Sequence, residues 1–488
     1  MVLLLIVLLV WLVRLVSKST CDTTVSLTSQ RTIIKMRILS TVIFLAYAND
    51  NDAFVPEVWA QESLMVLENT MVATNLVHRD FSNEVAQFGD VVNTRKPGTF
   101  TAARKGNNDD VTDQDASATN VAVPLDQHLH TSFVIKDGEE SKSMKDLVNE
   151  YLKPAAISLA EAADQIVLAQ TYQFLGNAVG KLGTTITKDV VIAAREKLNT
   201  LKCPVSGRNF LIGPNMEGAL LGIADFLNAE KVGDAGTTLR EGSLGRKFGL
   251  DTYMAQQVPS IVTAATASGA INLAAGYAVG TTALTVDGFS AAITNGGWVS
   301  VDGQPYKVAG TTGGATPTVI TIDAPGLRVA VADNAVVSSF APSLVNLAAG
   351  YAAGWYKGMV YDTVTPIKVG QLISSATGIY AAIGGTTSTS LVLDRPLVTA
   401  VADDAVLGRG PAGEYGFAFH RNAIAFVTRP LSTPRAGTGA LSSVANYNGL
   451  GLRVTITYDG KAQGHRVTLD MLAGVKVLDT ALGCPVLG

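Results

Sequence analysis

The sequence has little charge. Charged side chains make up 16% of its 488 residues, against roughly 25% in an average soluble domain. The formal net charge is −4 at pH 7, which excludes the overall positive charge that is typical of nucleic-acid-binding proteins. Any contact with nucleic acid would therefore be local and made through phosphates.

Cysteine is also scarce. Cys21, Cys203 and Cys484 lie far apart and form no C-x-x-C pair. This spacing argues against a zinc site and against a disulfide framework, and it favours a reducing compartment.

The familiar catalytic motifs are missing as well. The sequence contains no H-E-x-x-H, no Walker loop and no G-x-S-x-G. His128 and His130 share one face of a predicted strand, and they could bind a metal only if a third ligand came from elsewhere. We therefore expect no catalytic residue, no cofactor, no metal and no enzymatic activity.

The first 50 residues are unusually apolar. Met1–Val16 is short for a membrane span and lacks the basic start of a secretory signal. A second apolar run, Ile38–Ala48, follows Arg37 and is more signal-like. The favoured interpretation is that residues 1–50 are a leader outside the folded protein, with translation starting at Met36 or later.

Glycine, alanine, threonine and valine are abundant, and the 47 glycines indicate β structure with many tight turns. A length of 488 residues suffices for roughly three domains and a sizeable core.

The longest helical pattern runs from Lys142 to Gly180, and Ser141 or Ser143 can cap its start. Pro154 falls inside it and either opens a second helix or kinks a continuous one. One face of the pattern is lined, at steps of four, three and three, by Leu159, Ala163, Ile166 and Ala169.

A short helix is predicted over Phe54–Thr70 and a strand over Phe88–Arg95. The polar stretch Lys96–Thr131 follows. Its alternation from Asn120 to Leu129 predicts that part of it is an extended hairpin reaching away from the body.

Patches of opposite charge lie next to each other in this stretch. A basic patch precedes an acidic one, and such neighbouring patches suit contact between identical copies, although a solvated loop is the alternative. The candidate contact residues are Arg95, Lys96, Arg104, Lys105, Asp109 and Asp110, followed by Asp113 and Asp115.

The composition changes between Ala264 and Pro411, where charge thins out and a repeat appears. Asn272–Ala278 (NLAAGYA) recurs as Asn346–Ala352, and three further matches follow in the same order. Two tandem antiparallel β units inserted into a host domain are therefore predicted. The matching pairs are Tyr306 with Tyr380, Asp323 with Asp394, and Val331–Val336 with Val401–Val406.

Two strands are predicted near the end of the chain. Gly451–Gly460 and Gly464–Asp479 alternate apolar and polar residues and are joined by a short turn.

Four segments together resemble the major capsid (coat) proteins of tailed bacteriophages, in the short-tailed branch whose coat carries an inserted β domain. Their order and spacing carry the resemblance. They are Phe54–Gly98 (FVPEVWAQESL…RKPG), Gly242–Pro259 (GSLGRKFGLDTYMAQQVP), Ala418–Leu431 (AFHRNAIAFVTRPL) and Leu469–Leu478 (LDMLAGVKVL).

The resemblance implies an α+β fold of the Hong Kong phage type, with an N-terminal arm, an extended β loop, a long spine helix, and peripheral and axial domains. The apolar leader and the doubled insert depart from that family. The implied parts are the arm at 51–84, the extended loop at 85–136, the spine helix and peripheral/axial core at 137–263, the inserted β domain at 264–411 (repeats at about 271–341 and 345–411), and the return to the core at 412–488.

The implied function is structural. Many copies would form hexamers and pentamers of an icosahedral shell around double-stranded DNA, with a scaffolding protein and a portal as partners. Assembly would take place in the host cytoplasm, the product would be the virion, and no stable membrane association is expected. Pro154 would act as a hinge between hexamers and pentamers.

Two alternatives stay open. The leader and the repeats also suit a surface-anchored β-repeat adhesin or S-layer protein. A metalloenzyme built on His128 and His130 is the more remote possibility.

Overall fold

The computed structural model describes most of the chain from Pro56 onward. The chain divides after Val55 into two units, and every described residue belongs to the second. The predictions for the leader (1–50) and for capping by Ser141 or Ser143 fall outside the described residues. The structure describes residues 56–79, 91–96, 102–107, 110–111, 113, 119–137, 151–227, 241–362, 366–376, 378–435, 437, 439–447 and 449–488.

The predicted mixture of helices and strands is confirmed, with strands predominating. No helix within the described ranges is long and apolar enough to cross a membrane.

A five-stranded antiparallel sheet is built around one long strand, β25 (Gly464–Val477). β3 pairs along one edge of β25, whereas β24 and then β22 pair along the other, and β23 lies beyond β24. β24 and β25 confirm the two strands predicted near the end of the chain. The other four strands are β3 (Gln127–Lys136), β22 (Ile424–Arg429), β23 (Leu441–Tyr447) and β24 (Leu450–Asp459).

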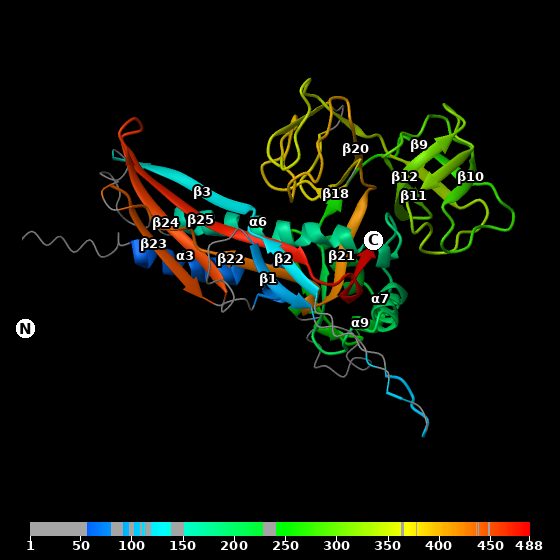
Figure 1. Ribbon diagram of the computed structural model, residues 1–488, viewed down its shortest axis with the longest axis horizontal. Helices are drawn as coiled ribbons and strands as arrows, with labels where there is room; N and C mark the ends of the chain where they lie inside the picture. Colours follow the sequence, from blue (N-terminus) through cyan, green and yellow to red (C-terminus); the bar gives the residue numbers. More distant parts are fainter. Residues whose placement is uncertain are drawn as a thin grey trace, which may run out of the picture. The chain divides into compact units, whose positions relative to one another are not determined.

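Two helices pack against this sheet (Figure 1). α3 (Pro56–Thr70) contacts β23, β24 and α6, and α6 (Lys153–Ala169) contacts β3 and β25. A 3₁₀ helix, η3 (Gln170–Asn177), directly follows α6. The predicted apolar face of α6 is confirmed, since all four of its residues, from Leu159 to Ala169, are buried.

Pro154 lies in the first turn of α6, one residue after its start at Lys153. The missing amide proton costs little there, because first-turn amides have no partner within the helix. Tyr151 and Leu152, directly before α6, already form a π-helical turn, so Pro154 lies within a run of helical backbone and does not begin it. Residues 138–150, which would show how far this helical backbone extends toward the N-terminus, lie outside the described residues.

A second sheet has the strand order β4-β26-β21-β5-β7-β6, with β8 beside β21. α7 (Lys188–Thr200) packs on β26 and β4, and α8 (Pro214–Leu221) packs on β21 and on α9 (Ala224–Leu227). The strands are β4 (Val179–Gly180), β5 (Arg208–Ile212), β6 (Arg246–Lys247), β7 (Leu250–Met254), β8 (Ser260–Ile261), β21 (Gly413–His420) and β26 (Gly483–Leu487).

The repeated segment leaves this sheet at β8 and returns to it at β21. The two strands pair with each other, Gly413 opposite Ile261 and Glu414 opposite Ser260. A long excursion that begins and ends on neighbouring strands leaves the host sheet intact.

Each repeat folds into its own six-stranded unit (Figure 1). The first module is a closed barrel of β9 (Ala267–Ile271), β10 (Ala283–Asp287), β11 (Trp298–Val301), β12 (Gln304–Thr312), β13 (Val319–Ile322) and β14 (Val336–Ser339). The second module is a sheet of β15 (Ser343–Val345), β16 (Met359–Asp362), β17 (Leu372–Ser375), β18 (Gly378–Ala381), β19 (Ser390–Leu391) and β20 (Val406–Arg409).

The strands follow the same order in both modules, and one pairing differs. β12 and β13 pair over several residues and close the first module. The equivalent strands of the second module, β18 and β19, form no regular ladder. The ends of the two segments meet irregularly instead, through the bridge Ala382–Leu393 and the backbone bonds Ile383 N to Val392 O and Asp394 N to Ala381 O, both 3.0 Å.

The repeated NLAAGYA sequence forms the same turn twice. Gly276 and Gly350 have φ of 63° and 62°. A Cβ at either glycine would lie 2.4 Å from a backbone oxygen across the turn, so both the conformation and the space require glycine. The bridges that follow are Tyr277–Val331 and Tyr351–Val401.

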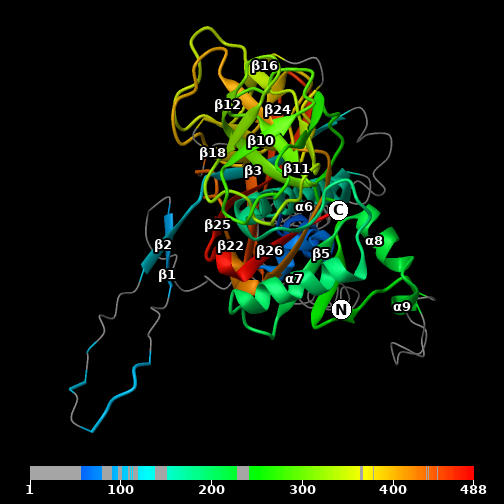
Figure 2. The same ribbon diagram turned by 90° about the vertical axis from the view of Figure 1, so that its right-hand side faces the viewer.

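The polar stretch predicted as one long loop is divided. β1 (Val91–Lys96) and β2 (Thr119–Pro124) form an antiparallel hairpin (Figure 2), whereas β3 belongs to the five-stranded sheet. β2 ends at Pro124, which has no amide proton to continue the ladder. The described part of the strand predicted over Phe88–Arg95 begins at Val91.

Candidate functional site

The base of the β1–β2 hairpin is anchored by apolar side chains. Val92 and Val123 are buried against Leu125 and against Ala425 and Val427 of β22. Beyond this base, every described residue of the connection from 102 to 113 is exposed. The hairpin is therefore held firmly at one end, and the described residues of its connection are left uncovered by the rest of the chain.

The candidate contact residues fall on this hairpin and its connection. Arg95 and Lys96 end β1, and Arg104, Lys105 and Asp110 lie in exposed, irregular backbone. Asp109 lies outside the described residues. That these six residues contact another copy remains a prediction.

One buried carboxylate joins α6 to the segment that follows α3. Asp164, 4% exposed, accepts hydrogen bonds from the Val72 and Thr74 amides, both at 2.8 Å, and from Thr74 Oγ1 at 2.6 Å. It thereby satisfies amides at the start of α4 (Ala73–Leu76). Burial raises the pKa of Asp164, and the hydrogen bonds that it accepts oppose this.

A second buried carboxylate joins the second module to the core. Asp394 accepts from the Ala381 amide at 2.8 Å and from Gln170 Nε2 of η3 at 3.3 Å. Its carbonyl oxygen accepts from Gln127 Nε2 of β3 at 2.9 Å. Burial raises the pKa of Asp394 to about 6, and Arg395 lowers it only partly.

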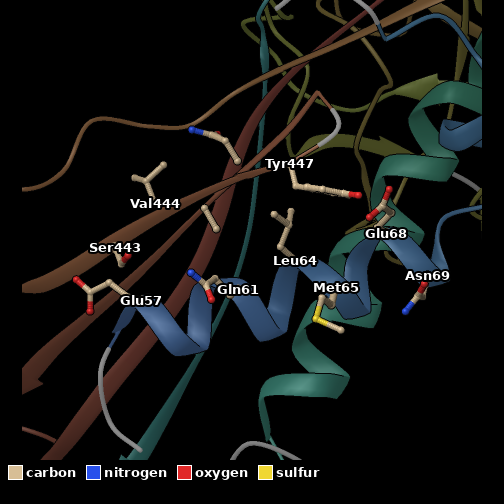
Figure 3. A pocket seen from close by; sticks show the side chains of 11 residues that line it. Glu57, Gln61, Leu64, Met65, Glu68, Asn69, Ser443, Val444 and Tyr447 are labelled. Atoms are coloured by element: carbon tan, nitrogen blue, oxygen red, sulfur yellow. The ribbon is translucent and has the colours of Figure 1, made fainter. Parts of the chain in front are cut away.

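A groove of about 600 Å³ runs between α3 and β23 (Figure 3). Leu64 and Tyr447 lie between the helix and the strand, and Met65 is 63% exposed. Glu57 and Glu68 are eleven residues apart on one helix, or about 16 Å along its axis. That separation is too large for a pair of carboxylates acting on one bond.

His128 and His130 do not gather a metal site. Their ring centroids are 6.1 Å apart, and His128 Nε2 lies 3.8 Å from Asp470 Oδ2. Asp470 is already bound by Arg453, whose Nε donates to Oδ1 at 2.8 Å. Among the residues that the structure describes, no three His, Cys, Asp or Glu side chains are placed to hold one metal ion.

Two of the three cysteines are buried thiols. Burial raises the pKa of Cys203, and it raises the pKa of Cys484 to about 12. Since the thiolate is the reactive form, neither side chain is set up as a nucleophile.

Sequence reasoning missed Asp164, Asp394 and Gln127. Asp164 lies outside the apolar stripe of α6, because consecutive helical residues point about 100° apart, so the stripe gave no sign of its burial. In the sequence, Asp394 stood out only because it matches Asp323 in the repeat, and Gln127 belongs to no motif or periodic pattern.

No protein-family model and no curated protein matches the chain. The chain is similar to a solved structure from Mycobacterium phage Che8 at 13% identity, covering 85% of this chain and 90% of that one, with a TM-score of 0.42. It is also similar to the capsid structure of cyanophage P-SCSP1u (12% identity, 82% and 84% covered, TM-score 0.37) and to the capsid of a native GTA particle (9%, 85% and 90%, TM-score 0.37). Identity and TM-scores are low, so function is inferred from this chain's own residues.

Replacing Asp164 by alanine should loosen the contact between α3/α4 and α6. Three donors would lose their acceptor, so we expect the free energy of unfolding to fall by about 3 kcal/mol. Urea unfolding followed by circular dichroism measures it. Glu161→Ala, an exposed acid on the same helix, is the matched control and should change stability by less than about 0.5 kcal/mol. Equal effects of the two variants would contradict the role given to Asp164.

Asp394 should make stability depend on pH. Its pKa in the folded chain, about 6, exceeds the ordinary 3.8, so the folded chain holds a proton that the unfolded chain releases. Stability should therefore fall as pH rises from about 4 to about 6, by up to about 3 kcal/mol.

In Asp394→Asn, the fall in the free energy of unfolding between about pH 4 and about pH 6 should vanish. Urea unfolding at a series of pH values measures it. Asp323→Asn, at the matching position of the first module where the side chain is 49% exposed, is the control and should keep the slope of the unsubstituted chain. An unchanged slope in Asp394→Asn would refute the assignment.

Proposed function

We propose that this chain is the structural subunit of an icosahedral viral capsid of the tailed-phage kind, and that its copies form hexamers and pentamers enclosing double-stranded DNA. The observation that carries the proposal is the β1–β2 hairpin. Its base is buried against β22, and the described residues of its connection are all exposed. A long connection of this kind in a compact chain is typically functional, and here it offers a surface to a neighbouring copy.

The other parts of the chain can be assigned in the same framework. α3 and α4 belong to the arm (51–84), and β1 and β2 to the extended loop (85–136). α6 is the spine helix of the segment 137–263, the two modules are the insert (264–411), and 412–488 return to the core. The Asp164 contacts support an arm fixed to the spine, and the β8–β21 pairing supports an insert that leaves the host sheet whole.

The weak charge of the chain suits this role. Subunits that meet over many surfaces desolvate fewer charges when the surfaces carry few, and burying unpaired charge is unfavourable. A near-neutral lining also avoids binding packaged DNA tightly through its phosphates. A scaffolding protein and a portal would be the further partners, assembly would occur in the host cytoplasm, and the virion would be the final location.

The apolar leader and the repeated modules support one alternative, a surface-anchored adhesin or S-layer protein. The two proposals differ in where the mature chain is found. A chain beginning between Met36 and Asp52 in sedimenting icosahedral particles fits the capsid, and a chain retained in the envelope fraction fits the adhesin. Electron microscopy, with mass spectrometry of the N-terminus, distinguishes them.

Deleting Lys96–Asp115 should leave a folded subunit that forms no shells, because the deleted residues lie beyond the buried base of the hairpin. Circular dichroism measures folding, and sedimentation with electron microscopy measures assembly. Replacing the same residues by a glycine–serine linker of equal length is the matched control, and it should fail in the same way if side chains make the contact. Shells of normal yield from the deleted chain would refute the role of the loop.

We further propose Pro154 as a hinge at the start of α6. A proline in the first turn leaves the preceding segment free of one helical hydrogen bond, so the chain can enter the helix at more than one angle. The entry angle should differ between subunits of hexamers and of pentamers in a reconstruction of the shell. Identical angles in the two environments would end the hinge proposal.

A further inference from the structure

A pocket of about 350 Å³ lies where β3, α6 and the second module meet. Its apolar lining combines Ile166 of α6, Ile383 and Val392 of the second module, and Leu129 of β3. Two of its polar side chains are already paired. Gln165 Oε1 accepts from the Gly384 amide, and Ser158 bonds the Ala155 carbonyl.

The ionisable side chains that line this pocket are all basic: His128, His130 and Lys357. In the part of the chain that the structure describes, the Lys357 ammonium and the Tyr356 hydroxyl have no hydrogen-bond partner. On the histidine side, Asp470 accepts from Arg453 Nε at 2.8 Å and lies 3.8 Å from His128 Nε2, and no carboxylate among the described residues lines the pocket itself. An apolar floor with Lys357 on one side and two imidazoles on the other favours a ligand that is apolar in the middle and offers oxygen acceptors on both sides.

The fold does not require Tyr356 and Lys357. The first module has threonine and alanine at the matching positions and keeps the same backbone bonds, so the aromatic and basic side chains were not needed to form this turn. The matching positions are Thr281 with Trp355, Thr282 with Tyr356 and Ala283 with Lys357. In one matching pair, the Leu327 amide donates to the Thr281 carbonyl in the first module and the Leu397 amide donates to the Trp355 carbonyl in the second, both at 2.9 Å. In the other pair, the Ile322 amide donates to the Thr282 carbonyl at 2.9 Å and the Leu393 amide donates to the Tyr356 carbonyl at 2.8 Å.

The chain itself carries a segment with the complementary chemistry. Val111 is 73% exposed and stands between the exposed carboxylates Asp110 and Asp113. We propose that this segment of the β1–β2 connection docks in the pocket of a second copy, with Val111 on the apolar floor and the two carboxylates toward Lys357 and the histidines. The proposal rests on the capsid function proposed above and names the site of that contact.

Such a contact is heterologous, because the loop of one copy meets a different surface of the next. Each copy offers one loop and one pocket, so repetition of the contact forms rings when the rotation closes. The pocket also includes the second module, so the insert would take part in joining copies.

A charge reversal in the full chain tests the pairing. Lys357→Glu and Asp110→Lys should each raise the protein concentration needed for shells by about ten-fold or more, because each places like charges together. The double variant should recover to within about two-fold of the unsubstituted chain. Ala283→Glu, the matching exposed position of the first module, should assemble normally, and circular dichroism checks that each variant is folded.

Normal assembly of Lys357→Glu, or a double variant no better than the single ones, would overturn the proposed pocket. If one of these outcomes is found while the unsubstituted chain and Ala283→Glu form shells, the proposed capsid function is kept and only the proposed docking pocket is rejected. If the unsubstituted chain forms no shells, the capsid function fails, and the pocket is then decided by peptide binding.

Peptide binding is measured by fluorescence anisotropy with a labelled peptide of residues 106–117 and the full chain. Binding should weaken about ten-fold in Lys357→Glu, and also with added salt, because salt screens the charge pairs. A peptide of the same composition in scrambled order should bind more weakly than the natural one. Equal binding of the two peptides, or equal binding to Lys357→Glu, would refute docking of Val111 between its acids.

Discussion

α6 and the turn after it bond through polar side chains to segments on different sides, and the arrangement of the core depends on these bonds. On one side Asp164 accepts three hydrogen bonds from the segment after α3. On another, Gln165 accepts from Gly384 of the second module, and just beyond the helix Gln170 donates to Asp394. A buried carboxylate without its donors is costly, so these bonds fix the arm, the helix and the second module against one another.

The two modules show what duplication keeps and what it changes. The glycine turn and the strand order are kept, because a side chain at Gly276 or Gly350 would meet backbone. The acid at the matching position differs in its surroundings: Asp323 is half exposed, whereas Asp394 is buried in the contact with η3 and β3. At this matching position the second module alone buries its acid against the core, whereas the first module reaches η3 through Arg328, whose Nη1 donates to the Leu175 carbonyl at 2.8 Å.

The proposed contact between copies would use the parts of the chain that its own fold leaves unsatisfied. The β1–β2 connection is acidic around Val111 and exposed, and the pocket beside the second module is basic around an apolar floor. Together they would give a directional contact in which charge sets the orientation and the buried valine adds affinity.

Several features followed from the sequence alone, because local periodicity and repetition record them directly. The apolar stripe of α6, the alternating strands β24 and β25 and the repeated NLAAGYA turn each depend on residues close together in the chain. The sequence placed Pro154 inside the helical pattern but left open whether it opens a helix or kinks a continuous one, and the structure places it in the first turn of α6 directly after the π-helical Tyr151 and Leu152.

Other features were decided only by the tertiary structure. The pairing of β3 with β25, the burial of Asp164 and Asp394, and the pocket between β3, α6 and the second module all depend on segments far apart in the chain. Gln127 and Asp394, for example, are 267 residues apart. Such contacts leave no local pattern, because the partner of a buried polar group is chosen by packing and not by its neighbours in the chain. The sequence by itself thus determined the elements and the repeat, while the tertiary structure decided which charges are buried and which remain exposed for another copy.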